Sequence, residues 1–236
     1  VMLVLGAAAV LGAKSDAEIG ITRDAFAVVV ATMFMAMFVY LGEVTILGGI
    51  GMFTCLIAYY VYTYSVAISG EDEYEFEDSW LPNKMSLAIP FCAIGGAMIW
   101  FGAELLVLGS TGIAETFGVS QAVIGLTVVA LGTSLPELAV TIVAGIRGQG
   151  GVAVGNVLGS NVMNIMGIIG IASIVGSGIP VDEEFQRDIV VVIATSGFVV
   201  WMLISGKEFT KNIGTMMILT YLFYMTYLSG FLGGLF

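Results

Sequence analysis

The sequence contains no histidine, and it has only two cysteines and four prolines among 236 residues. Without histidine, the protein lacks the side chain that most often relays protons, binds transition metals or acts as a general base near neutral pH. The two cysteines, Cys55 and Cys92, lie inside apolar runs, which indicates neither a disulfide framework nor a zinc site. Charged residues make up only 11% of the chain, far fewer than a soluble domain of this size carries.

Apolar residues dominate the remaining sequence. They make up 58% of the chain, and the mean hydropathy is +1.03. Several apolar runs reach the ~20 residues that a helix needs to span a bilayer. We predict complete spans at roughly 24–41, 45–67, 85–112, 120–146, 152–175, 187–205 and 213–233, and the end of a further helix at 1–13. The sequence therefore predicts an all-α polytopic membrane protein that lies in a lipid bilayer, and no nucleic-acid partner is expected.

The positive charges are distributed unevenly between the two sides of the predicted membrane. With alternating spans, only Arg187 falls on one side, and the other positive residues fall opposite: Lys14, Arg23, Lys84, Arg147, Lys207 and Lys211. Because Lys and Arg favour cytoplasmic loops, the loop at 68–84 is predicted to be cytoplasmic and the C-terminus to lie outside. The acidic run at 71–78 has no EF-hand spacing, so we interpret it as a solvated loop.

The chain also contains an internal repeat. Residues 2–42 align with 166–206, and the dipeptide Arg23-Asp24 then coincides with Arg187-Asp188. After a slip of one residue the match resumes, with Ile50-Gly51 against Ile213-Gly214. The charge distribution places the two copies in opposite orientations. Inverted repeats are typical of secondary transporters, which hold their substrate near the bilayer midplane between broken helices.

The repeat predicts how the chain is divided. Residues 1–67 are expected to be the remainder of a first repeat, 68–84 an acidic cytoplasmic loop, and 85–236 a complete second repeat. In this alignment the first-repeat counterpart of Glu137 would lie before residue 1. We therefore expect an N-terminally truncated chain with about seven full transmembrane helices and a partial first one.

Residues 128–143, VVALGTSLPELAVTIV, place polar groups in the middle of an apolar run. Pro136 has no N–H for the carbonyl of Gly132, so we expect a break in the helix and free carbonyls nearby. Thr133 and Glu137 are four residues apart, which directs their oxygen atoms to one region. A carboxylate inside a membrane needs a cation or a partner to offset its cost. Oxygen ligands of this kind suit Ca²⁺ or Na⁺.

The next helix carries a polar stripe in the sequence GNVLGSNVMN, residues 155–164. Asn156, Ser160 and Asn164 recur every four residues and therefore share one helix face. For Asn156 and Asn161 a purely structural role, in which small and polar residues hold two helices together, is an equal alternative. The other membrane carboxylate, Glu104, is open to a structural role as well.

At these residues the sequence resembles a known family. Residues 102–138 followed by 155–170 are similar to the second α-repeat of the sodium/calcium exchanger family, within the cation/calcium antiporter superfamily, and most of all to its bacterial and archaeal members. The resemblance implies an inverted-repeat exchanger fold of about ten helices, of which this chain would hold the end of helix 3 through helix 10. It also implies a secondary active Ca²⁺/Na⁺ antiporter in a prokaryotic cell membrane, with Ca²⁺ and Na⁺ as transported ions and no organic cofactor.

The resemblance further implies a set of ion ligands. Glu137 would be the central carboxylate shared by Ca²⁺ and Na⁺, with Thr133 contributing its backbone carbonyl and Ser134 its hydroxyl. Ala130 would offer a backbone carbonyl to an outer Na⁺ site. Two residues of the next helix would complete the lining: Ser160 and Asn164. Some relatives carry aspartate at the position of Asn164, so the ion stoichiometry does not follow from the resemblance.

Two other functions have to be weighed. A Ca²⁺/H⁺ antiporter would use Glu137 to carry the proton, but such exchangers typically have a GN-containing motif where this chain has GTS. An intramembrane enzyme is a distant alternative, because histidine is absent and the aspartates lie in loops or at helix ends.

The ligands of one repeat are missing from the sequence. We therefore expect that the chain alone neither binds Ca²⁺ tightly nor transports it, because one carboxylate poorly matches a divalent ion at the midplane. The missing N-terminal half, or a second copy of the chain, is the partner that would complete the site.

Overall fold

The computed structural model describes residues 1–11, 19–69, 85–116, 118, 124, 130–181 and 183–228. The acidic run at 71–78 and the basic residues Lys14 and Lys84 lie outside these ranges. The described elements are almost entirely helical, and their bounds are α1 Met2–Val10, α2 Ile19–Leu41, α3 Ile46–Ser69, α4 Met85–Thr116, α6 Ala130–Thr133, α7 Leu135–Ile146, α8 Gly150–Val162, the π-helix η2 Met163–Ile169, α9 Gly170–Val175, α10 Glu183–Ile204 and α11 Lys211–Leu228.

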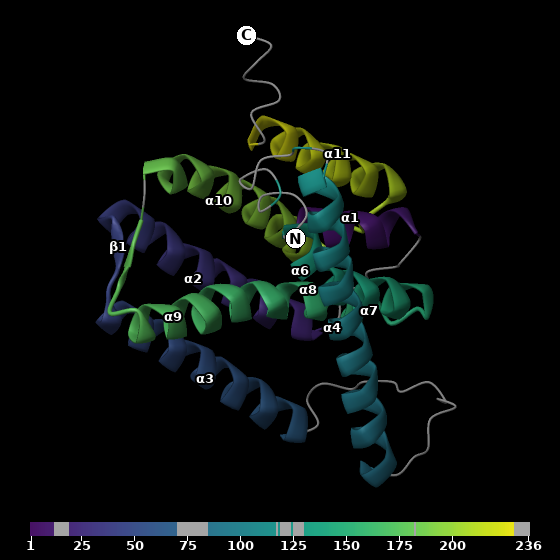
Figure 1. Ribbon diagram of the computed structural model, residues 1–236. Helices are drawn as coiled ribbons and strands as arrows, with labels where there is room; N and C mark the ends of the chain where they lie inside the picture. The colour runs from purple at the N-terminus through teal and green to yellow at the C-terminus, as the bar shows by residue number, and fades with distance from the viewer. Residues whose placement is uncertain are drawn as a thin grey trace.

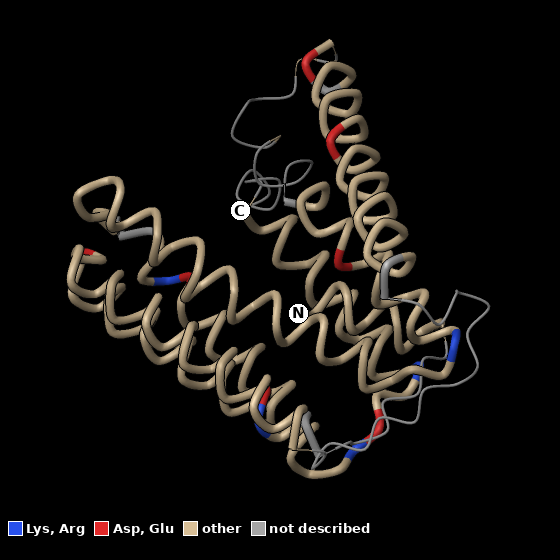
Figure 2. The backbone as a smooth tube through the Cα atoms, turned by 90° about the horizontal axis from the view of Figure 1, so that it is seen from below, with Lys and Arg blue, Asp and Glu red and all other residues tan. Residues whose placement is uncertain are grey.

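Five of the described helical segments are long and apolar enough to cross a membrane: Thr22–Leu41, Ile46–Ser69, Leu87–Ile113, Gly150–Val175 and Phe185–Ile204. The fourth of these runs without interruption through α8, η2 and α9. The span predicted at 120–146 contributes the shorter apolar helix α7. The prediction of an all-α polytopic membrane protein is confirmed, and Figure 2 shows that the basic residues lie mostly near helix ends.

The helices form a layered bundle with one helix set apart (Figure 1). The helices α2 and α10 pack along each other, and α8 packs against α2 and α7. The long helix α4 crosses the others at a steep angle and contacts α6 and α7 (Figure 1). The apolar window of α4, Leu87–Ile113, has none of its residues buried within the described structure. Most of its large apolar side chains are therefore exposed, as in a helix that faces lipid.

Two further helix pairs are equivalent under the repeat, and each joins a helix of one copy to a helix of the other. The helix α1 packs on α11, and its counterpart α9 packs on α3. A glycine pair marks each crossing: a Cβ added to Gly6 would lie 2.9 Å from the carbonyl oxygen of Gly214, and one added to Gly49 would lie 2.6 Å from that of Gly170. Gly6 and Gly170 are aligned residues of the repeat. This pairing supports the repeat, while the limits of its two copies stay a prediction.

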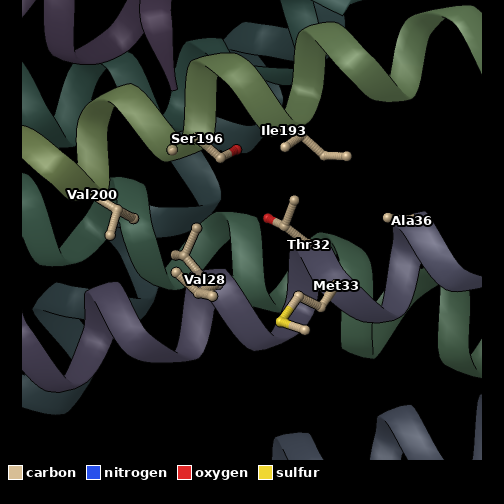
Figure 3. A pocket seen from close by; sticks show the side chains of 9 residues that line it. Val28, Thr32, Met33, Ala36, Ile193, Ser196 and Val200 are labelled. Carbon is tan, nitrogen blue, oxygen red and sulfur yellow. The ribbon is translucent and has the colours of Figure 1, made fainter.

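The contact between α2 and α10 lies at the centre of this arrangement. It borders a cavity of about 170 Å³, and Figure 3 shows Thr32 and Ser196 on its two sides. These two residues are aligned in the repeat, and both are buried. At one end of the bundle, a short antiparallel ladder joins β1 (Glu43–Val44) to β2 (Ile179–Pro180). The ladder links the α2–α3 connection to the α9–α10 connection.

Candidate ion site

The helix break predicted from Pro136 is present. The helix α6 ends at Thr133 and α7 begins at Leu135, with Pro136 in the first turn of α7. Ser134 lies between the two helices, and its N–H donates to the carbonyl of Leu131 at 3.1 Å. The break places Glu137 in the first turn of α7. A helix N-terminus carries partial positive charge, so this position stabilises a carboxylate.

Glu137 lines an open cavity of about 460 Å³. The walls come from α3, α4, α7, α8 and the first residue of η2, and the lining residues are Tyr60, Gly96, Ile99, Trp100, Pro136, Glu137, Val140, Gly155, Asn156, Gly159, Ser160 and Met163. We call this space the Glu137 cavity. Glu137 is the one charged side chain among these described lining residues, and its Oε2 atom is buried with no hydrogen-bond partner. A buried carboxylate oxygen without a partner is costly, and a cation in the cavity would offset that cost.

Asn156 on α8 fixes the turn that carries Glu137. Its Nδ2 donates to the backbone carbonyl of Glu137 at 3.1 Å and to Oγ1 of Thr141 at 2.9 Å. Thr141 is fully buried. Asn156 therefore has a structural role on the polar face of α8. The sequence had left open whether its role is structural or in the ion site. The glycines on either side, Gly155 and Gly159, leave room for the cavity.

The structure brings together two of the predicted ligands. Glu137 and Ser160 line the same cavity. The Ser160 hydroxyl donates to the carbonyl of Val157 at 3.1 Å, which leaves its oxygen lone pairs available for a ligand. The roles assigned to the site residues from the resemblance nevertheless stay predictions.

The other predicted ligands are not among the described lining residues of the Glu137 cavity. Thr133 is exposed and Ser134 is half-buried at the helix break, where each makes contacts of its own. Ala130 begins α6. Asn164 is exposed and lies within the π-helix η2, and π-turns are frequent at functional sites. The role of Glu104 was left undecided by the sequence. This residue is exposed on α4 and is not among the lining residues of the Glu137 cavity.

Aromatic walls of the cavity were not found by sequence reasoning. Tyr60 and Trp100 come from α3 and α4, far from Glu137 along the chain, and no local spacing points to them. No group of three or more Cys, His, Asp or Glu side chains gathers within the part of the chain that the structure describes. The acidic chemistry of the described cavity therefore depends on Glu137.

The Asn156 contacts give a first testable prediction. Replacing Asn156 with leucine removes both donated hydrogen bonds and takes the Asn156 donor away from the buried Thr141 hydroxyl, which is expected to cost about 1–3 kcal/mol of stability. Thermal unfolding of the purified protein in detergent measures this effect. The matched control is Asn161→Leu, because the Nδ2 atom of Asn161 is buried on the same helix without a partner. An equal loss in the two variants would contradict the assigned role of Asn156.

Comparison with known proteins adds the family context. Residues 87–230 match the family model described as sodium/calcium exchanger protein. The antiporter candidate CaxA of Alkalimonas amylolytica is 31% identical over 202 residues, and the sodium/calcium exchanger MaX1 of Methanosarcina acetivorans is 42% identical over 87 residues. Among solved structures, the sodium-calcium exchanger NCX_Mj superposes with a TM-score of 0.73 at 26% identity, over 95% of this chain and 71% of that one.

The chain is shorter than the curated relatives that it matches. The alignment with CaxA covers 83% of this chain and 63% of the relative, and that with MaX1 covers 37% and 25%. Both relatives come from prokaryotes, and both are named for transport rather than for an enzymatic reaction.

Proposed function

Because the chain belongs to the sodium/calcium exchanger family, we propose that it acts in a secondary active antiporter that exchanges Ca²⁺ for Na⁺ by alternating access. The observation that carries the proposal is the buried Oε2 of Glu137, which has no hydrogen-bond partner and lines a cavity at a helix break. Hard cations such as Ca²⁺ and Na⁺ bind oxygen ligands, and the Glu137 carboxylate supplies an oxygen ligand with negative charge.

The ligand set follows in the same proposal. Glu137 is the shared carboxylate, and Ser160 on α8 contributes its hydroxyl from the lining of the Glu137 cavity. Thr133, Ser134 and Ala130 add oxygen atoms from the helix break. Asn164 in η2 is the remaining proposed oxygen ligand.

The remaining features of the proposal concern placement and partners. The protein is an integral membrane protein, and we place it in a prokaryotic cell membrane with the C-terminus outside, as the positive charges favour. We propose that a partner completes the ion site, either the other repeat of an exchanger or a second copy of this chain. The expected inactivity of the 236-residue chain on its own also stays a prediction. Na⁺-driven Ca²⁺ uptake by liposomes that contain this chain alone would contradict it.

The coupling ion gives a second testable prediction. In liposomes that hold an active exchanger containing this chain, Ca²⁺ uptake at fixed pH is expected to require an outward Na⁺ gradient, because the GTS motif supplies neutral oxygen ligands for Na⁺. A pH gradient without Na⁺ is the matched control, and it is expected to drive little uptake. Uptake driven by the pH gradient alone would favour the runner-up, a Ca²⁺/H⁺ antiporter with Glu137 as the proton carrier.

A further inference from the structure

The helix α3 packs closely in its first half and loosely in its second. In the first half, Met52 and Leu56 are buried, and Gly49 lies at the crossing with α9. In the second half, Ile57–Ser69, every residue is exposed or half-buried. Because little apolar surface is buried there, packing alone fixes the position of this half only weakly.

A hydrogen bond links this second half of α3 to α2. The Tyr59 hydroxyl donates to Oδ1 of Asp24 on α2 at 2.9 Å. The other side-chain hydrogen bonds that we see in this half, from Ser65 and Ser69, end on carbonyls of α3 itself. A hydrogen bond to a charged carboxylate is among the stronger kinds in proteins. The Tyr59–Asp24 bond therefore supplies a specific link where apolar packing is weak.

The Asp24 carboxylate is itself held in place. Arg23 Nε donates to the same Oδ1 atom at 3.1 Å, and the two side chains are mostly buried, at 16% and 14% exposed. The positive charge of Arg23 offsets the cost of burying the carboxylate. The other oxygen, Oδ2, lies 3.8 Å from the position of a Cβ on Gly155 of α8, an ordinary van der Waals distance. Asp24 thus binds α3 and borders α8.

Both of these contacts lead to the Glu137 cavity. Gly155 lines this cavity from α8, and Tyr60, the residue after Tyr59, lines it from α3. The ring centroids of Tyr59 and Tyr60 are 5.4 Å apart. Because the two tyrosines belong to one helix turn, a bond that fixes the rotation of α3 at Tyr59 also fixes where the Tyr60 ring lies.

We propose that Asp24 is a positioning residue of the ion site. By accepting the Tyr59 hydrogen bond, Asp24 holds the second half of α3, and with it Tyr60, in place at the wall of the Glu137 cavity. The cavity then keeps the width at which Glu137 meets a cation. This inference rests on the proposed function, because it requires that a cation binds in the Glu137 cavity. Asp24 acts through Tyr59 and is not itself an ion ligand.

A first measurement follows the position of α3 and needs no transport. Spin labels are attached to cysteines that replace Val61 on α3 and Val152 on α8, two exposed residues. The background carries Cys55→Ala and Cys92→Ala, which removes the free cysteines. Electron paramagnetic resonance then gives the distribution of distances between the labels in the detergent-solubilised chain, after thermal unfolding has shown that the fold is intact.

The substitution Tyr59→Phe removes a single hydroxyl and is expected to broaden or shift this distance distribution. The matched control is Tyr64→Phe, because Tyr64 is an exposed tyrosine of the same half of α3. The control is expected to leave the distribution unchanged. An unchanged distribution in Tyr59→Phe, or an equal change in the two variants, would overturn the proposal.

A second measurement separates positioning from charge. In liposomes that hold an active exchanger containing this chain, Tyr59→Phe is expected to raise the KM for Ca²⁺ by about fivefold to tenfold. The maximal rate is expected to change little, because a displaced wall weakens ion binding rather than the later steps. Asp24→Asn keeps an oxygen that accepts from Tyr59 but removes the charge, and its KM is expected to stay closer to that of the unchanged protein.

Two kinetic results would count against the proposal. An unchanged KM in Tyr59→Phe would overturn it, and so would a raised KM in Asp24→Asn alone, which would assign the effect to the charge of Asp24. The label distances are read without ion flux. A failure of Na⁺-driven Ca²⁺ exchange would therefore refute the proposed function, while the distances would still show whether the Tyr59–Asp24 bond positions α3.

Discussion

Replacing Glu137 with alanine in an active exchanger that contains this chain is expected to abolish Na⁺-driven Ca²⁺ uptake, with a loss of about hundredfold or more. Glu137 is the one charged side chain among the described lining residues of its cavity, so no nearby carboxylate of this lining replaces it. The helix break places this side chain in the N-terminal turn of α7, where the helix dipole stabilises the negative charge of the carboxylate. The measurement is Ca²⁺ uptake into liposomes driven by an outward Na⁺ gradient.

The matched control for this loss is Glu104→Ala. Glu104 is the second carboxylate of the apolar runs, but it is exposed on α4 and lies outside the lining of the Glu137 cavity. Uptake is therefore expected to survive this change. Thermal unfolding of both variants tests whether the fold is intact. Retained exchange in the Glu137→Ala protein would remove Glu137 from the ion site, and the proposed function would lose its main support.

Replacing Gly49 with alanine is expected to destabilise the fold by about 1–3 kcal/mol. A Cβ at this position would overlap Oγ of Ser173 and lie 2.6 Å from the carbonyl oxygen of Gly170. Ser173 is fully buried, and a backbone carbonyl inside a helix cannot move without separating α3 from α9. Thermal unfolding in detergent measures the loss, and it should be accompanied by easier proteolysis of α3.

The neighbouring glycine on the same helix provides the control. Gly51 has no atom within 4 Å of a Cβ built on it, so alanine fits there without contact. Alanine also has the higher helix propensity, and Gly51→Ala is expected to be neutral or to stabilise the protein by up to about 1 kcal/mol. A similar loss of stability in both variants would show that close packing at the α3–α9 crossing is not the cause.

The fold could be predicted to a large extent because its signals are local. Each apolar run of about 20 residues forms a helix in a bilayer whatever its neighbours are, since only helices satisfy the backbone there. The predicted span at 152–175 matches the continuous segment Gly150–Val175, and that at 45–67 matches α3. Pro136 likewise predicts the break before α7, because a missing N–H acts within one turn.

The glycine crossings show where such prediction ends. The sequence repeat aligns Gly51 with Gly214, yet it is Gly49 that meets the backbone of Gly170 in the structure. Which of two neighbouring glycines faces another helix depends on the rotation of α3 about its axis, and tertiary packing sets that rotation. The same reason explains why Tyr60 and Trp100 were not anticipated as walls of the Glu137 cavity.

The sequence by itself determined that this protein lies in a lipid bilayer, where its helices run, where one helix breaks and which carboxylate lies at the break. These depend on composition and on spacings of a few residues, which act within one helix. Only the tertiary structure decided that Asn156 secures the Glu137 turn, that Asn164 lies exposed in a π-helix, and that Asp24 accepts a hydrogen bond from Tyr59 of the following helix. Such contacts join residues far apart in the chain, and their geometry depends on how whole helices turn and cross.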